Sequence, residues 1–352
     1  MIRVGLVGFG LAGRVFHAPL ISSIEGLELA AVVERNSDNA AARYPGITTY
    51  RTVEELLADS TIKLIVVASP NATHFDIAML ALEAAKNVVV DKPAAITSAE
   101  IAQLTELAGG IGLHIIPFHN RRWDGDFKTV QTILDEKQLG TLAHFESTFD
   151  RWSPGPSRRA WKEDAGEGGV LLDLGTHLVD QALVLFGIPA FVGADVRRER
   201  EGEGANDAFT IRLRYFTGLT VTLGANCLSS LPRPRFHLRG TRGNYGKWGL
   251  DPQEEALGAI TRIESADWGT EPADRWGTLF TDTGGAAISK PVPTAAGDYR
   301  EFYAGVRDAL LGTAPVPVTA LDAWRTARIL EWAIESSKTS RDIECDWTAV
   351  PD

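Results

Sequence analysis

Residues 2–13 read Ile-Arg-Val-Gly-Leu-Val-Gly-Phe-Gly-Leu-Ala-Gly, and this stretch decides the fold. Ile2–Val7 is the nearly continuous apolar run of a strand that is buried on both faces. The loop Gly8-Phe9-Gly10-Leu11-Ala12-Gly13 follows at once and leads into a helix. Its first glycine permits a tight turn, and its second lets the backbone approach a pyrophosphate at the amino end of that helix. Because strand, loop and helix come in this order, the sequence predicts dinucleotide binding.

The pattern of strand and helix continues to about residue 120. Apolar runs of strand length recur at Leu29–Val33, Leu64–Ala68, Val88–Val90 and His114–Pro117. Between them, Thr52 with Glu55 and Thr97 with Glu100 form capping boxes that mark two helix starts. Alternation of this kind predicts a doubly wound Rossmann domain with a parallel sheet over residues 1–120.

The rest of the chain, residues 121–352, has a different order of predicted helices and strands. Helical patterns cover Phe127–Asp135, Gly175–Phe186 and Leu321–Ser336, and strand patterns cover Phe209–Tyr215 and Leu219–Leu223 with a turn at Thr217-Gly218. Since strands here follow strands, we expect an α+β domain with a largely antiparallel open sheet and helices on one face. We expect a second subunit to cover the other face, and the last helix could pack back on the first domain.

Composition excludes several classes of protein. The 352 residues suit two domains, and a net charge of -11 argues against a nucleic-acid partner. No apolar run approaches the ~20 residues that cross a bilayer, and the start lacks a signal-peptide pattern, so we expect a cytoplasmic protein without a membrane partner. With only Cys227 and Cys345, neither a disulfide framework nor a metal site is expected.

The end of the second strand bears on the choice of cofactor. Glu34 lies 21 residues beyond Gly13, where a carboxylate would accept hydrogen bonds from the ribose hydroxyls of NAD and repel a 2′-phosphate. Arg35 follows, and its guanidinium could instead bind that phosphate or stack on adenine. The cofactor is therefore NAD or NADP, with NAD slightly favoured.

Two more segments follow strands at the edge where open α/β sheets bind ligands. The first is Ser69-Pro70-Asn71-Ala72-Thr73-His74, which also suits a plain helix start capped by Asn71 or Thr73. The second is Asp91-Lys92-Pro93. We expect both to contact the cofactor, and the ammonium of Lys92 to reach a substrate oxygen as well. The cofactor-binding residues predicted outside the glycine loop are Glu34, Arg35, Ser69, Pro70, Asn71, His74, Asp91 and Lys92.

Asp173 and His177 lie four residues apart on a predicted helix and therefore face the same way. Histidine exchanges protons near neutral pH, and a carboxylate one turn away can orient it and stabilise its charge. A helix cap beside a buried, hydrogen-bonded histidine would give the same pattern.

Together these residues resemble the Gfo/Idh/MocA family of oxidoreductases over essentially the whole chain. The glycine loop, Ser-Pro-Asn-x-x-His, Asp-Lys-Pro and Asp-x-x-x-His occur in the family's order. The stretches 118–124, 169–177 and 245–254 look like the branch that contains NADP-dependent scyllo-inositol dehydrogenases. The resemblance implies that Lys92, Asp173 and His177 are the catalytic set and that the second domain forms a dimer.

The chain departs from the family at two places. Asp91 stands where the family usually has Glu, and Glu34-Arg35 stands where NADP-linked members tend to have Ser-Arg. Because the side chain of Asp91 is one methylene shorter than that of Glu, it can change the position of Lys92 slightly. The difference at Glu34-Arg35 weakens any transfer of the cofactor preference of NADP-linked members to this chain.

The substrate is expected to meet aromatic, amide and guanidinium side chains, which stack on sugar rings and donate to hydroxyls. These candidates are Asn120, Arg122, Trp152, Arg159 and Trp161. The last three belong to the loop before Asp173, which an exposed interface or a subunit contact would explain equally well.

We therefore expect an NAD(P)-dependent dehydrogenase that moves a hydride between nicotinamide and a hydroxyl-bearing carbon of a cyclitol, other polyol or sugar, and that assembles as a homodimer or homotetramer. His177 would take the hydroxyl proton, Lys92 would donate to the oxygen, and Asp173 would hold His177 or the substrate. Two alternatives remain open: an NAD-dependent glycosidase on the same fold, and a non-catalytic dinucleotide-sensing regulator.

Overall fold

A computed structural model describes residues 1–156, 168–202, 204–259, 263–282 and 287–351 of the chain. In the first part the strands are β1 (Ile2–Val7), β2 (Leu27–Val33), β3 (Thr48–Tyr50), β4 (Leu64–Val67), β5 (Asn87–Val90) and β6 (Ile115–Pro117). The helices there are α1 (Ala18–Ser22), α2 (Asn39–Arg43), α3 (Val53–Ala58), α4 (His74–Glu83) and α5 (Ser98–Gly110). Short π or 3₁₀ turns are η1 (Ala12–His17), η2 (Asn71–Thr73) and η3 (Asn120–Trp123).

The second part contains nine strands and five helices among the residues described. The strands are β7 (Leu142–Asp150), β8 (Phe191–Arg197), β9 (Ala208–Arg214), β10 (Thr220–Asn226), β11 (Phe236–Gly240), β12 (Gly243–Lys247), β13 (Gly277–Thr281), β14 (Ile288–Val292) and β15 (Ile343–Glu344). The helices are α6 (Gly125–Asp135), α7 (Thr176–Phe186), α8 (Gln253–Gly258), α9 (Arg300–Leu310) and α10 (Ala320–Thr339), with turns η5 (Leu171–Gly175) and η6 (Ala273–Arg275).

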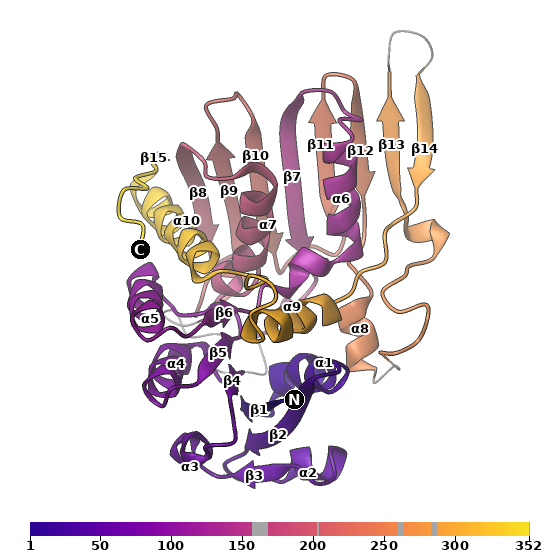
Figure 1. The fold of residues 1–352 in the computed structure, drawn as a ribbon. Helices are drawn as coiled ribbons and strands as arrows, with labels where there is room; N and C mark the ends of the chain where they lie inside the picture. Colours follow the sequence, from indigo (N-terminus) through magenta and orange to yellow (C-terminus); the bar gives the residue numbers. More distant parts are fainter. Residues whose placement is uncertain (157–167, 203, 260–262, 283–286, 352) are drawn as a thin grey trace.

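The first sheet is parallel and has the order β3-β2-β1-β4-β5-β6 (Figure 1). Val7 lies between Val33 of β2 and Val67 of β4, so these strands end at one edge. The apolar runs of β1, β4 and β5 are buried because helices cover both faces. Thr52 and Thr97 cap α3 and α5 in capping boxes, as their spacing predicts.

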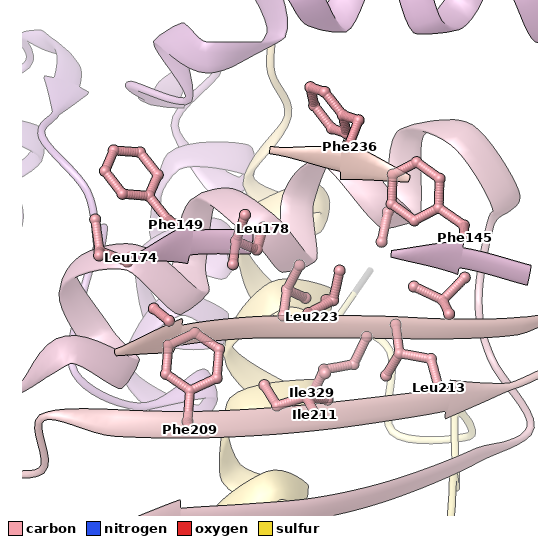
Figure 2. Packing of buried hydrophobic residues seen from close by; sticks show 14 of the residues in the cluster. Phe145, Phe149, Leu174, Leu178, Phe209, Ile211, Leu213, Leu223, Phe236 and Ile329 are labelled. Atoms are coloured by element: carbon pink, nitrogen blue, oxygen red, sulfur yellow. The ribbon is translucent and has the colours of Figure 1, made fainter. Parts of the chain in front are cut away.

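The second sheet has the order β14-β13-β12-β11-β7-β10-β9-β8-β15 and is antiparallel except for the parallel pair β10 and β7. Helices α6, α7 and α10 lie on one face (Figure 1). Between them and the sheet is a core of aromatic and aliphatic side chains that includes Phe145, Phe209, Leu178 and Ile329 (Figure 2). The predicted fold class, a Rossmann domain followed by an α+β domain with an open sheet, is confirmed.

Helices from the end of the chain connect the two sheets. Phe302 and Tyr303 of α9 pack with Phe118, directly after β6, in the core of the first domain. Helix α10 packs against α5 on one side and against α7 and β8 on the other. This packing places the carboxyl edge of the first sheet beside the start of α7. Among the residues described, no helix is long and apolar enough to span a bilayer.

Candidate active site

The glycine loop has the backbone geometry that a dinucleotide requires. Gly8 has φ +96°, and a Cβ there would lie 2.7 Å from the carbonyl oxygen of Ala68. A Cβ on Gly13 would collide with the carbonyl oxygen of Gly8, so the η1 turn packs tightly on the loop. A Cβ on Gly10 would meet nothing within 4 Å, because this residue faces open space. The exposed backbone at Gly10 therefore fits a pyrophosphate.

Phe9 and Leu11, between the glycines, point in different directions. Phe9 is buried and meets the ring of Tyr44 edge-on, with the ring centroids 6.3 Å apart. Leu11 is 42% exposed beside Gly10. Only the backbone of Phe9 is therefore placed to meet a cofactor.

The carboxylate of Glu34 is bound within its own loop. Oε2 accepts a hydrogen bond from the backbone amide of Ala40 at 2.7 Å, and Oε1 accepts from Ser37 Oγ at 2.7 Å and Asn39 Nδ2 at 3.3 Å. Glu34 is 6% exposed, whereas Arg35 is exposed. The structure thus places the carboxylate at the first turn of α2. The sequence had instead predicted that it would contact the ribose of the cofactor.

His74 joins the loops that follow β4 and β5. Its Nδ1 lies 2.7 Å from the carbonyl oxygen of Pro93, and its Nε2 lies 2.9 Å from that of Ser69. Both ring nitrogens are therefore engaged with protein, so we expect His74 to position Lys92 and Pro93 and not to contact the cofactor itself. Ser69 Oγ lies 2.7 Å from Thr73 Oγ1, and Asn71 is buried in the η2 turn.

Asp91, the residue before the candidate lysine, anchors the backbone of that lysine. Its Oδ1 accepts from the backbone amide of Lys92 at 2.8 Å, and its Oδ2 lies 3.9 Å from His17 Nε2. The other ring nitrogen of His17 lies 2.6 Å from the hydroxyl of Tyr303 on α9. Burial alone would raise the pKa of Asp91, but the contact with His17 and the charges of His17 and Lys92 lower it.

Lys92 and Asp173 meet across the two domains. Lys92 Nζ donates to Asp173 Oδ1 at 2.9 Å and to the backbone oxygen of Asp173 at 2.7 Å. The two side chains are 16% and 22% exposed, so the pair lies in a partly covered site. On the other carboxylate oxygen, Arg151 Nη2 approaches Asp173 Oδ2 to 3.3 Å. An ammonium carries three N–H donors, so one remains for a substrate oxygen.

A π turn, η5, presents Asp173. Gly169 before it has φ +91°, and a Cβ there would lie 2.6 Å from the side chain of Asn206. Asn206 in turn accepts from the backbone amides of Val170 and Leu171 at 2.9 and 2.8 Å. Glycine is therefore required at position 169 for this turn to begin, and π turns often occur at functional sites.

His177 follows on the first turn of α7 and is 5% exposed. Among the residues described, its Nδ1 has no hydrogen-bond partner. Burial first, and then the charges of Lys92, Arg121 and His119, lower its pKa well below the ordinary range, whereas Asp173 raises it. The imidazole is therefore neutral near pH 7 and available as a base.

Sequence reasoning missed two buried residues near His177. His119 is 1% exposed, and burial is the largest cause that lowers its pKa. Arg121 pairs with Glu254 at 2.5 Å, and its guanidinium carbon lies 5.0 Å from the centroid of the Phe149 ring. Both belong to the stretch 118–124, and the basic residues of this stretch were the feature of the sequence that could have identified them.

The expected substrate residues divide into three groups. Asn120 is 4% exposed at the start of η3, and its side chain has no hydrogen bond to any residue the structure describes. Arg122 instead donates to Asp180 at 2.9 and 2.6 Å and lies 3.3 Å from Asp322, so its guanidinium joins η3 to α7 and α10. Trp152 is 61% exposed, and Arg159 and Trp161 lie outside the described residues.

Comparison with known proteins identifies the family. Residues 2–117 match the oxidoreductase family with an NAD-binding Rossmann fold, and residues 127–246 match the Gfo/Idh/MocA C-terminal domain. The chain belongs to the Gfo/Idh/MocA family of NAD-binding oxidoreductases, with NAD or NADP as its cofactor.

Relatives cover nearly the whole chain. An uncharacterized oxidoreductase of Escherichia coli, YdgJ, is 41% identical over 96% of both chains. The scyllo-inositol 2-dehydrogenase (NADP(+)) IolW of Bacillus subtilis is 32% identical over 97% of this chain and 95% of that protein. Among solved structures, yvaA of Bacillus subtilis superposes with a TM-score of 0.95 at 31% identity and covers 98% of both chains.

Proposed function

We propose that this protein is an NAD(P)-dependent dehydrogenase that oxidises a ring hydroxyl of a cyclitol or sugar, with residues 1–120 binding the dinucleotide and residues 121–352 binding the substrate. The observation that carries the proposal is the Lys92–Asp173 contact beside a buried neutral His177. The relative named as a scyllo-inositol dehydrogenase supports a cyclitol as the first substrate to test.

The three side chains have distinct roles in this proposal. His177 accepts the proton of the substrate hydroxyl, because its lowered pKa keeps it unprotonated near neutral pH. Lys92 directs its remaining N–H to the same oxygen and stabilises the negative charge that develops there. Asp173 holds the ammonium at 2.9 Å and offsets part of the positive charge that His177 gains.

A bound nicotinamide supplies the hydride acceptor, and the backbone of Gly8–Gly13 with the loops of Ser69 and Asp91 would hold the cofactor beside Lys92. Asn120, buried at the start of η3, would donate to or accept from a substrate hydroxyl. Arg151, paired with Asp173, and Trp152 form the exposed side of the site.

The direct test is the appearance of reduced cofactor, measured by its ultraviolet absorbance, when the protein is mixed with scyllo-inositol, myo-inositol or aldoses and either NAD or NADP. One reduced cofactor should form for each substrate oxidised. His177→Asn should lose at least ~10²-fold in kcat, as expected for a general base. The matched control is His114→Asn, because His114 is exposed directly before β6 at the opposite edge of the sheet.

Two results would contradict the proposal. Turnover of an aryl glycoside with only catalytic amounts of NAD would identify a glycosidase on this fold. Tight dinucleotide binding without oxidation of any polyol, together with unchanged behaviour of His177→Asn, would favour a regulator that senses the dinucleotide.

A further inference from the structure

His17 joins the glycine loop to the residue before Lys92. The η1 turn, Ala12–His17, begins inside the glycine loop and ends at this histidine, whose side chain is fully buried. Its Nε2 lies 3.9 Å from Oδ2 of Asp91, while Oδ1 of the same carboxylate accepts from the backbone amide of Lys92 at 2.8 Å. One short turn therefore carries both part of the loop that faces the dinucleotide and the ring that faces Asp91.

The partners of His17 decide which of its ring nitrogens carries the proton. The hydroxyl of Tyr303 on α9 lies 2.6 Å from Nδ1, and Tyr303 is fully buried as well. A carboxylate attracts an N–H and repels a lone pair, so the favoured tautomer has its proton on Nε2, facing Asp91. The hydroxyl of Tyr303 then donates to Nδ1. Tyr303, His17 and Asp91 thus form a buried chain of polar groups that ends at the amide of Lys92.

Packing fixes the ring of His17 within this chain of groups. The ring of Phe118, directly after β6, lies 4.3 Å from it between the ring centroids. Directly after Lys92, the carbonyl oxygen of Pro93 lies 2.7 Å from Nδ1 of His74 on α4. The backbone on each side of the lysine is therefore faced by a buried histidine, and the two histidines come from different elements.

A purely structural role explains the polar pair of His17 and Tyr303 poorly. Buried polar atoms cost stability unless they are paired, and Nε2 of His17 has no hydrogen-bond partner among the residues that the structure describes. An apolar pair such as Leu and Phe would fill the same core without that cost. What the polar pair adds is an N–H dipole aimed at Asp91, whose contact with the amide of Lys92 sets the course of the backbone there.

From these contacts we propose that His17 and Tyr303 are positioning residues for Lys92. They hold the carboxylate of Asp91, and through it the backbone from which the ammonium reaches Asp173. Because both are fully buried, neither meets the substrate. Misplacing a reacting group by about 1 Å can cost about 10²-fold in rate, so turnover can depend on residues of this kind. The inference rests on the role of Lys92 in the proposed function.

The double variant His17→Leu/Tyr303→Phe separates positioning from stability. It removes both polar groups and nearly keeps their volume, so its Tm should stay within about 5 °C of wild type. Positioning predicts a kcat that is lower by about ten- to a hundredfold, with unchanged affinity for NAD and NADP by calorimetry. An unchanged kcat would overturn the proposal. A parallel loss of dinucleotide affinity would also overturn it, because His17 would then support the glycine loop instead of Lys92.

Two amide variants test the contact with Asp91 by itself. At position 17 the amide nitrogen of Gln can take the place of Nε2 and donate to Asp91, whereas the shorter Asn reaches only the place of Nδ1, beside Tyr303. Each buries one amide, so the two variants should have similar Tm values. His17→Gln should retain at least about ten times the kcat of His17→Asn. Equal kcat values would contradict a role through Asp91.

The pKa of His177 reports the position of Lys92 without turnover, because the charge of the ammonium lowers it. An NMR titration should find this pKa higher in His17→Asn than in wild type, the direction expected when Lys92 is removed, and unchanged in His17→Gln. An unchanged value in His17→Asn would refute the positioning of Lys92. If wild type oxidises no polyol, the proposed function fails, but this titration still decides the role of His17.

Discussion

Lys92 Nζ lies 2.9 Å from Oδ1 of Asp173 and 2.7 Å from the backbone oxygen of the same residue. Lys92 follows β5 in the first domain, whereas Asp173 lies on the π turn before α7 in the second. The contact therefore fixes the distance between the two domains where both would meet the substrate. Its partial burial makes the ion pair stronger than a fully exposed one.

Lys92→Met should lower kcat by at least ~10²-fold, because it removes the positive charge beside the reacting oxygen and the contact that positions Asp173. Steady-state kinetics with a cyclitol and saturating cofactor would measure the loss. Lys128→Met is the matched control, since Lys128 also pairs with a carboxylate, Glu301 at 2.6 Å, but lies away from the site. Equal activity of the two variants would refute a catalytic role for Lys92.

The pKa of His177 can be measured directly by an NMR titration, with His177→Asn assigning its signal. We expect a value well below that of a free histidine, because the ring is buried and faces the charges of Lys92, Arg121 and His119. Lys92→Met should raise this pKa, whereas Lys128→Met should leave it unchanged. An ordinary pKa in the wild type would mean that the imidazole is more solvated than the structure indicates.

Among the residues described, no helix packs on the face of the second sheet opposite α6, α7 and α10, and this open face predicts self-association. Thr222 of β10 lies on this face between Arg212 of β9 and Glu146 of β7. Light scattering at micromolar concentration should report at least a dimer. Thr222→Arg should weaken it by placing a further charge at the centre, whereas Thr132→Arg, on exposed α6 across the sheet, should not. A monomeric wild type would contradict this prediction.

The sequence predicted the parts of the molecule that depend on local patterns. Ile2–Val7 became β1 with the same bounds, because a buried parallel strand must be apolar on both faces. The edge strand β3, Thr48–Tyr50, was missed because it is short and partly exposed and has no apolar run. Long-range pairings were missed for a different reason. Nothing local to Arg122 indicates that its partners are Asp180 and Asp322, which the fold alone brings to it.

The histidines 74 and 119 allow a controlled comparison of buried polar groups. Each is 1% exposed. His74 has a carbonyl partner at each ring nitrogen, whereas neither ring nitrogen of His119 has a hydrogen-bond partner among the described residues. The pKa of His119 is lowered, chiefly by burial and against the charge of Asp180. Below about pH 6.5 the unfolded chain therefore binds more protons at this residue than the folded chain does.

His119 therefore lowers the free energy of unfolding as the pH falls from about 6.5 towards the pKa of His119 in the folded protein. Above that range its contribution to the free energy of unfolding does not change with pH. Burial raises the pKa of Asp251 to about 6, so this residue makes the free energy of unfolding change with pH in the opposite direction. The pH dependence of the wild type alone therefore cannot isolate the contribution of His119.

Urea denaturation of His119→Leu isolates that contribution. This variant should be as stable as wild type or more stable at about pH 7.5, and its stability relative to wild type should increase at about pH 5.5. His74→Leu should instead lose about 1–3 kcal/mol of unfolding free energy at about pH 7.5, because the carbonyl oxygen of Ser69 or of Pro93 loses the ring N–H from which it accepts a hydrogen bond. If His119→Leu were as destabilising as His74→Leu, His119 would have a bonding partner, such as a buried water, that its burial and lowered pKa do not indicate.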